Sequence, residues 1–183
     1  MRIVGGALKG RPIRTPPGLD TRPTSDRARQ AVFNILEHAP WSGGVAGERV
    51  IDLFAGSGAM GLEALSRGAA SCLFIERARP AAAVIRQNIE ALRLGERARL
   101  LERDASRLGP APAGVGLAFL DPPYHSGLGL LALGSLRSGG WLEPGAVAVL
   151  ETAADEEPAV PEGFEALDRR RYGAAAVTLL RLG

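Results

Sequence analysis

The sequence predicts an α/β protein with a Rossmann-like, mostly parallel sheet, helices on both faces and an antiparallel C-terminal hairpin. From residue 49 onward, short apolar segments alternate with segments of helical periodicity. This alternation favours right-handed crossovers between parallel strands. The last two apolar segments follow one another without a helix and meet at the turn Tyr172-Gly173, which is typical of a hairpin.

Each element follows from its own local pattern. Thr24 or Ser25 can cap a first helix that runs to about His38, because a hydroxyl can accept a hydrogen bond from a free N–H of the first turn. One face of that helix carries the apolar residues Ala28, Ala31, Val32, Ile35 and Leu36, as a buried helix face requires. Three further helices are expected at 58–67, 80–94 and 128–137, and strands at 49–54, 71–75, 99–102, 115–120, 146–151, 164–170 and 175–182.

The length of 183 residues suits one domain with a small appendage. We expect a basic N-terminal extension at 1–40 and the main domain at 41–183. No apolar run is long enough for a transmembrane helix, and the N-terminus lacks the apolar stretch of a signal peptide. Cys72 is the single cysteine, so no intramolecular disulfide can form, and we expect it to be buried as a small apolar residue. The sequence therefore predicts a cytoplasmic protein, and nothing in it demands more than a monomer.

Positive charge is concentrated at the N-terminus. Residues 1–38 carry seven Lys or Arg against three acidic residues, whereas the net charge of the whole chain is only +2. A basic arm on a nearly neutral body suggests a polyanionic partner such as nucleic acid. A solvated charged tail is the alternative.

A glycine loop follows the first strand. Asp52-Leu53-Phe54-Ala55-Gly56-Ser57-Gly58 lies where that strand ends and a helix begins, and ligands bind at this position in open parallel sheets. Gly56, Gly58 and Gly61 also fit the spacing of a dinucleotide fingerprint, with Glu76 near the place of its ribose-binding acid. A nicotinamide-dependent oxidoreductase is therefore one alternative.

Acidic residues favour S-adenosylmethionine over a dinucleotide. Asp52, Glu76, Asp104 and Asp121 each end or follow a successive strand, and parallel strands deliver such residues to one edge of the sheet. A carboxylate in the glycine loop suits the cationic amino-acid end of S-adenosylmethionine better than it suits a pyrophosphate. Asp104 could accept a hydrogen bond from the adenine amino group.

The tetrad Asp121-Pro122-Pro123-Tyr124 follows the fourth strand. It could be merely a rigid loop, since two prolines fix φ and remove two N–H donors. Its composition also suits methylation of a planar amino group on a nucleobase. Asp121 and the Pro122 carbonyl can each accept an N–H as positive charge builds on the nitrogen, and Tyr124 can stack on the base. His125 is expected to be an exposed loop residue rather than a proton acceptor.

Several segments of the sequence together match one known family. They are the segment from Arg22-Pro23-Thr24-Ser25 to Phe33-Asn34-Ile35-Leu36, residues 50–69, the opening Arg2-Ile3-Val4-Gly5-Gly6, the tetrad and the closing Arg171-Tyr172-Gly173. In these segments the sequence resembles the bacterial RsmD family of 16S ribosomal RNA (guanine-N2) methyltransferases, and the resemblance covers nearly the whole chain. Generic amino-methyltransferases lack the Arg-Pro-Thr-Ser segment, which makes that segment the most specific part.

The resemblance implies a class I methyltransferase fold with a seven-stranded sheet, S-adenosyl-L-methionine as cofactor and no metal. The implied partner is 16S ribosomal RNA in an assembled or partly assembled small subunit. Catalysis is expected from Asp121, Pro122, Pro123 and Tyr124. The expected cofactor site comprises Asp52, Phe54, Ala55, Gly56, Ser57, Gly58, Glu76, Arg77, Asp104 and Ala105, and the expected RNA-binding residues are Arg11, Arg22, Thr24, Ser25 and Arg27.

Three alternatives stay open from the residues alone. A DNA adenine-N6 methyltransferase would use the same chemistry, but the chain has little room for a target-recognition region. The nicotinamide-dependent oxidoreductase has no evident use for the tetrad. A non-catalytic RNA-binding module would retain the fold without turnover. The tetrad cannot by itself distinguish guanine N2 from adenine N6 or cytosine N4, so the choice of base depends on the resemblance.

Overall fold

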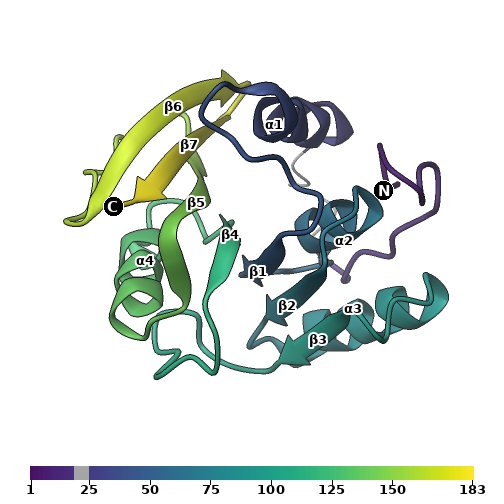
Figure 1. Cartoon of the computed structure of the whole chain (residues 1–183). Helices are drawn as coiled ribbons and strands as arrows, with labels where there is room; N and C mark the ends of the chain where they lie inside the picture. Colours follow the sequence, from purple (N-terminus) through teal and green to yellow (C-terminus); the bar gives the residue numbers. More distant parts are fainter. Residues whose placement is uncertain (19–24) are drawn as a thin grey trace.

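The computed structural model describes residues 1–18 and 25–183. A seven-stranded sheet with the order β3-β2-β1-β4-β5-β7-β6 forms its centre (Figure 1). The neighbouring strands from β3 to β5 are parallel, whereas β7 is antiparallel to both β5 and β6. The elements are α1 (Asp26–His38), β1 (Arg49–Leu53), α2 (Ala59–Ser66), β2 (Ser71–Ile75), α3 (Arg79–Ala91), β3 (Ala98–Leu101), β4 (Val115–Leu120), α4 (Leu128–Ser138), β5 (Leu142–Ala153), β6 (Phe164–Tyr172) and β7 (Ala175–Leu182).

Helices cover both faces of the sheet, as the alternating pattern predicted. Successive strand residues point to opposite faces, so Val50 packs with α1, α2 and α3, whereas its neighbour Ile51 packs with α4. Figure 1 shows α1, α2 and α3 on one side of the sheet and α4 on the other. In the described part of the chain, no helix has the length and apolarity needed to cross a membrane.

The chain reverses its direction of travel across the sheet between β1 and β4. It runs outward from β1 through β2 to β3, then returns to place β4 on the other side of β1. In an open α/β sheet, ligands bind beside such a switch point, outside the carboxyl ends of the strands. The carboxyl ends of β1, β2, β3 and β4 therefore define the edge at which a site is expected.

The element order predicted from sequence is confirmed, and β5 is the strand that differs most from its predicted bounds. β5 begins at Leu142 and ends at Ala153, whereas the apolar run predicted only 146–151. Its first part contains Pro144-Gly145, which is not a strand-like pair. Pairing with its neighbours extends it nonetheless, because Val115 of β4 is in register with Leu142 and β7 pairs as far as Ala153. A register shift after Val115 accommodates the irregular residues.

The N-terminal extension is packed against α2 through backbone contacts. Val4 N–H donates to Glu63 Oε2 at 2.9 Å, and Leu8 N–H donates to Ser66 Oγ at 2.9 Å. Gly6 allows this approach because a Cβ at its position would lie 2.0 Å from the Ser66 carbonyl oxygen. Ile3 is 1% exposed, so the start of the chain contributes to the main core and is not simply a solvated tail.

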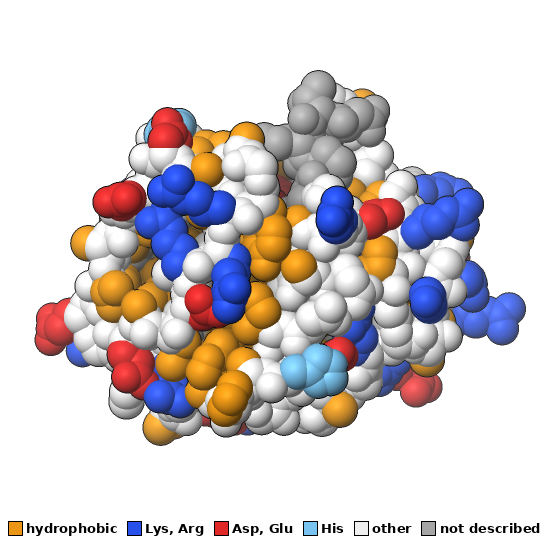
Figure 2. Space-filling view, turned by 90° about the horizontal axis from the view of Figure 1, so that it is seen from above, with side chains coloured by type: hydrophobic (Ala, Val, Ile, Leu, Met, Phe, Trp, Pro, Cys, Tyr) orange, Lys and Arg blue, Asp and Glu red, His pale blue; other side chains and the backbone are white. Residues whose placement is uncertain are grey.

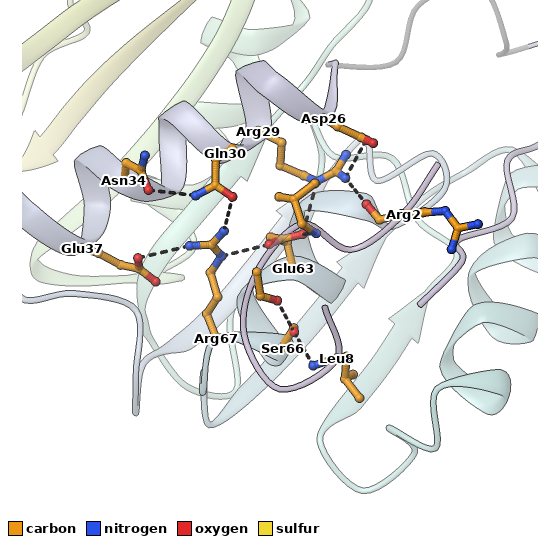
Figure 3. Close-up of polar contacts among 12 residues, drawn as sticks. Arg2, Leu8, Asp26, Arg29, Gln30, Asn34, Glu37, Glu63, Ser66 and Arg67 are labelled. Carbon is orange, nitrogen blue, oxygen red and sulfur yellow. Dashed lines mark hydrogen bonds and ion pairs between the residues drawn. The ribbon is translucent and has the colours of Figure 1, made fainter. Parts of the chain in front are cut away.

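The carboxylate of Glu63 connects the extension, α1 and α2. It is fully buried, at 0% exposure, and its Oε1 lies 2.9 Å from Nε of Arg67. On its other side Oε2 lies 3.4 Å from Nε of Arg29, which is also fully buried. Arg67 also pairs with Glu37 at 3.1 Å and donates a hydrogen bond to Gln30 Oε1 at 3.2 Å. Both partners are on α1 (Figure 3). One buried anion thus fixes how α1 and the extension lie on α2.

Substituting Glu63 is expected to destabilise the fold strongly. In Glu63→Leu, Arg29 would lose its buried anionic partner and keep only Asp26, whose side chain is half exposed. Removing one partner of a buried pair costs about 3–5 kcal/mol. Urea unfolding followed by circular dichroism measures the change in the free energy of unfolding. The matched control is Glu143→Ala, whose ion pair with Arg49 is about half exposed and should contribute at most about 1 kcal/mol. Equal effects of the two variants would contradict the structural role of Glu63.

Candidate functional site

A cavity of about 480 Å³ opens at the carboxyl edge of the sheet. The ends of β1, β2, β3 and β4 line it, together with Met1, Thr15 and Pro16 of the extension and Arg29 of α1. The structure brings most of the predicted cofactor and tetrad residues to this one cavity. They are Asp52, Phe54, Ala55, Gly56, Ser57, Glu76, Arg77, Asp104, Ala105, Asp121 and Pro123.

The glycine loop turns sharply between β1 and α2. Phe54, Gly56 and Gly58 have φ angles of 57°, 59° and 80°, in the left-handed region that costs a residue with a side chain extra energy. Two backbone hydrogen bonds hold the turn, from Ala55 N–H to the Ile75 carbonyl at 3.2 Å and from Gly58 N–H to the Ala55 carbonyl at 2.7 Å. The loop is therefore rigid before any ligand enters.

Gly61 lets α2 approach β2 closely. A Cβ at this position would lie 2.4 Å from Cε1 of Phe74 and 2.5 Å from Sγ of Cys72, and neither neighbour has room to move in the core. Cys72 is buried, as the sequence predicted. The close packing holds the N-terminus of α2 directly behind the glycine loop.

Asp52 is a buried carboxylate at the end of β1. It is 3% exposed, and its Oδ2 accepts a hydrogen bond from Gly61 N–H at 2.9 Å. Burial raises the pKa of Asp52 well above its ordinary value, repulsion by Asp121 and Glu76 adds to the rise, and the Gly61 N–H partly offsets it. A cationic ligand group beside Asp52 would favour the ionised form.

Glu76 follows β2, and its carboxylate accepts a hydrogen bond from the glycine loop. Its Oε2 accepts a hydrogen bond from Gly56 N–H at 2.9 Å, and its Oε1 accepts one from Ala78 N–H at 2.8 Å. These contacts fix the orientation of the carboxylate at the cavity wall. Carboxylate oxygens can also accept hydrogen bonds from ligand hydroxyls, because each oxygen has two lone pairs.

Asp104 lies beyond β3 at the other end of the cavity. Its Oδ1 accepts hydrogen bonds from Ser106 Oγ at 2.7 Å and from Ser106 N–H at 2.9 Å. The Ser106 contacts, with smaller contributions from Arg77 and Arg107, lower the pKa of Asp104. The neighbouring Ala105 is 4% exposed and offers an apolar surface. A carboxylate beside an apolar wall suits a flat heterocycle that carries an amino group.

Three contacts hold the tetrad in place. Asp121 N–H donates to the Leu53 carbonyl of β1 at 3.4 Å, and Ser126 Oγ donates to the Pro123 carbonyl at 2.5 Å. Tyr124 Oη donates to Oε1 of Glu151 at 2.9 Å, which fixes the direction of its ring. The tetrad therefore leaves β4 directly beside the cavity.

His125 lies on the outer side of the tetrad. Its Nε2 is 3.4 Å from Oδ1 of Asp155, and the two side chains are 61% and 77% exposed. Its backbone N–H donates to Glu156 Oε1 at 3.0 Å. The side chain is an exposed loop residue, as predicted.

Two buried polar residues support the site although the sequence did not single them out. Asn88 of α3 is 2% exposed. Its Nδ2 donates to the Ser57 carbonyl of the glycine loop at 2.9 Å and to the Arg14 carbonyl at 3.0 Å, and its Oδ1 accepts from Arg14 N–H at 2.9 Å. Glu151 on β5 is 9% exposed and holds Tyr124. Their hydrogen-bond partners are distant in the sequence, since Ser57 lies 31 residues from Asn88 and Tyr124 lies 27 residues from Glu151, so no local signal pointed to either residue.

The predicted RNA-binding residues fall into two groups. Arg22 and Thr24 lie outside the described residues. Ser25 accepts a hydrogen bond from Ala28 N–H at 3.1 Å and is the N-cap of α1, as one sequence interpretation expected. Arg27 is exposed on α1, and the exposed Arg11 donates to the Ala91 carbonyl at 2.9 Å.

Basic side chains gather in separate areas of one face. Figure 2 shows Lys and Arg side chains toward the right, on the side where the extension lies in Figure 1, and a second group toward the left, where β6 lies. Arg2, Lys9, Arg11 and Arg14 of the extension are all exposed. Across residues 1–18 and 25–183, no group of three or more His, Cys, Asp or Glu side chains is arranged to hold a metal ion.

Comparisons with known proteins identify relatives over the full chain. A family model named Conserved hypothetical protein 95 matches residues 1–181. Ribosomal RNA small subunit methyltransferase D of Escherichia coli K12 is 35% identical over 181 residues, covering 98% of this chain and 88% of the relative. The protein of that name in Haemophilus influenzae is 32% identical over 185 residues, covering 98% and 92%.

Solved structures agree with these relatives. The structure of the Escherichia coli methyltransferase yhhF matches with a TM-score of 0.85 and 33% identity, covering 100% of this chain and 97% of that one. The fold is that of class I methyltransferases, with a mostly parallel sheet and an antiparallel C-terminal pair. This confirms the fold class predicted from sequence.

Removing the charge of Asp52 is expected to stabilise the protein when no ligand is bound. The pKa of Asp52 is raised in the folded state. The carboxylate therefore lowers the free energy of unfolding as pH rises above the ordinary pKa of an aspartate, and this loss of stability becomes constant above the raised pKa. Asp52→Asn keeps an acceptor for Gly61 N–H and removes this penalty. Urea unfolding at about pH 4 and about pH 7 should show the variant gaining stability over the wild type as pH rises.

Asp104→Asn is the matched control for this measurement. The pKa of Asp104 is lowered, so its carboxylate stabilises the fold above the ordinary pKa and loses that contribution as pH falls. The variant should therefore lose stability relative to the wild type as pH rises toward the ordinary pKa of about 3.9, so this pair is also measured at about pH 3. A pH dependence of the same sign in both variants would refute this account of the two carboxylates.

Proposed function

Because the chain belongs to the RsmD family of ribosomal RNA small subunit methyltransferases, we propose that it methylates the exocyclic N2 amino group of a guanine in 16S ribosomal RNA. S-adenosyl-L-methionine is the methyl donor in this proposal. One observation carries it: Asp121 of the tetrad lines the same cavity as Asp52, Glu76 and Asp104. A methyl donor held by these three carboxylates would lie next to a group that can hold a base amino nitrogen.

The donor set of the cavity fits S-adenosyl-L-methionine. Asp52 beside the rigid glycine loop suits the α-amino group, Glu76 suits the ribose hydroxyls, and Asp104 with Ala105 suits the adenine. A dinucleotide fits less well, because the buried Asp52 would face a pyrophosphate of like charge. When bound, the cofactor supplies an electrophilic methyl group on a sulfonium.

The tetrad can hold the amino group in the geometry that attack requires. The nitrogen lone pair of a base amino group is delocalised into the ring, so the nitrogen must rehybridise before it can bond to the methyl carbon. The Asp121 carboxylate can accept one N–H, and the Pro122 carbonyl can accept the other. Both contacts strengthen as the nitrogen becomes positive. The proton leaves only after this charge has formed, so positioning is the main contribution of the protein.

Tyr124 can provide a platform for the base. Its ring is held in one direction by the hydrogen bond to the buried Glu151. An aromatic ring fixed at its hydroxyl end can stack on a base without losing side-chain entropy at the moment of binding. Enzymes that modify RNA bases require the base to leave its stack, and a preset ring lowers the cost of holding it outside.

The partner is 16S ribosomal RNA within an assembled or partly assembled small subunit, in the cytoplasm, with the enzyme acting as a monomer without a metal. Exposed Arg2, Lys9, Arg11, Arg14 and Arg27 supply positive charge for phosphates. Arg22, Thr24 and Ser25 remain candidate RNA-binding residues on the basis of the family motif.

Calorimetry should detect binding of S-adenosylhomocysteine, the demethylated product of the donor, to the purified protein. NADH should give no heat of binding, because its pyrophosphate would meet Asp52 and Glu76. Binding of NADH without binding of S-adenosylhomocysteine would overturn the proposed cofactor and favour an oxidoreductase.

Asp121→Ala is expected to lower the rate of methyl transfer about 10²–10³-fold, because one acceptor for the charged nitrogen is lost. The assay uses small ribosomal subunits from cells that lack the protein, with mass spectrometry of the digested nucleosides. The wild type should produce N2-methylguanosine. S-adenosylhomocysteine affinity, measured by calorimetry, is the control and should be nearly unchanged in the variant.

Other outcomes would correct specific parts of the proposal. N6-methyladenosine as the product would show that the base is wrong while the chemistry is right. Full turnover by Asp121→Ala would mean that the tetrad is only a rigid loop.

A further inference from the structure

Arg29 on α1 is a buried cation in the wall of the cavity. It is 0% exposed and lines the same space as Asp52 and the glycine loop. Its Nε faces Glu63 at 3.4 Å, and its Nη2 donates to Asp26 at 2.9 Å and to the Arg2 carbonyl. Its Nη1 is buried and has no hydrogen-bond partner in the described part of the chain. A buried charged donor without an acceptor is unfavourable. A ligand that offers an acceptor to Nη1 would therefore bind favourably.

Arg29 and Asp52 line the same cavity, and both contact α2. Asp52 Oδ2 accepts from Gly61 N–H, and Arg29 pairs with Glu63. The other described arginines of the cavity wall, Arg77 and Arg103, follow β2 and β3. Arg77 lies 3.8 Å from Asp104. Arg77 already pairs with an acidic residue of the cavity wall, whereas Arg29 Nη1 has no hydrogen-bond partner among the described residues.

We propose that Arg29 binds the α-carboxylate of the methionine part of S-adenosyl-L-methionine through Nη1. This inference rests on the proposed function, and it names the residue that recognises the anionic half of the amino-acid group. Asp52 matches the α-ammonium, and Arg29 matches the α-carboxylate. Without Arg29, the carboxylate would enter a cavity whose wall carries the four acidic residues Asp52, Glu76, Asp104 and Asp121.

Binding through Arg29 links the cofactor to the extension. Nη1 is shielded from solvent. The guanidinium, or the protein atoms that cover Nη1, must therefore shift slightly when the carboxylate binds. The same guanidinium donates to the Arg2 carbonyl and pairs with Glu63, which also holds Val4 N–H. The charged end of the cofactor therefore contacts the residue that anchors the start of the chain.

The experiment compares two ligands that differ by the carboxylate alone. Calorimetry measures the affinities of S-adenosyl-L-methionine and of its decarboxylated form, which keeps the amino group. The wild type should prefer the carboxylated ligand by about tenfold to a hundredfold, the value of a charged hydrogen bond inside a protein. In Arg29→Lys, the ammonium can still pair with Glu63 but has no second arm, so the preference should largely disappear.

Asp26→Asn is the matched control. It changes a half-exposed partner of Nη2 and leaves Nη1 alone, so it should retain the wild-type preference. Equal affinity of the wild type for both ligands would overturn the role of Arg29 while leaving the proposed function intact. An undiminished preference in a folded Arg29→Lys would overturn it as well. Failure of both ligands to bind would overturn the proposed cofactor itself.

If Arg29→Lys does not fold, a second measurement tests whether Arg29 binds the α-carboxylate. A crystal structure of the wild type with S-adenosylhomocysteine should show the carboxylate within hydrogen-bond distance of Nη1. A carboxylate held elsewhere in that structure would refute the inference.

Discussion

The buried carboxylate of Glu63 is the interaction on which the arrangement of the other parts depends. It accepts a hydrogen bond from Val4 of the extension, pairs with Arg29 of α1, and pairs with Arg67 at the C-cap of α2. A buried anion needs several partners to offset its desolvation, and each of these partners belongs to a different segment. Since α2 begins at the glycine loop, fixing the extension and α1 on α2 also fixes them relative to the cavity. The N-terminal segments are consequently part of the site.

The cavity combines local rigidity with an uneven distribution of charge. The glycine loop is held by Glu76 from one side and by Asn88 from another, so its shape is set before a ligand arrives. Acidic residues from successive strands face the cavity, and Asp52 has a raised pKa because it is buried among them. Such a site is destabilised until a cation enters. The ligand-free protein is therefore less stable than it would be without the buried charge, and a cationic ligand group that binds beside Asp52 removes this destabilisation.

The sequence predicted the periodic features well and the long-range partners poorly. Strand and helix order followed from local apolar patterns, and Asp52, Glu76 and Asp104 were recognisable because parallel strands deliver their ends to one edge. β5 was predicted too short, because Pro144-Gly145 argues against a strand locally whereas pairing with β4 and β7 extends it. Arg29, Glu63, Asn88 and Glu151 were not identified. Each is polar and buried, and at least one of the partners that make burial possible lies far away in the chain.

The hydrogen bond from Asp121 N–H to the Leu53 carbonyl has a consequence for motion. It joins the last residue of β1 to the first residue of the tetrad, across neighbouring strands of one ladder. When thermal motion deforms the sheet, the glycine loop and the tetrad move together, so the distance between them changes little. In many two-domain enzymes, the two reacting groups approach through closure of the domains. Here the spacing is built into a single hydrogen-bonded ladder, so the step that remains variable is the delivery of the base.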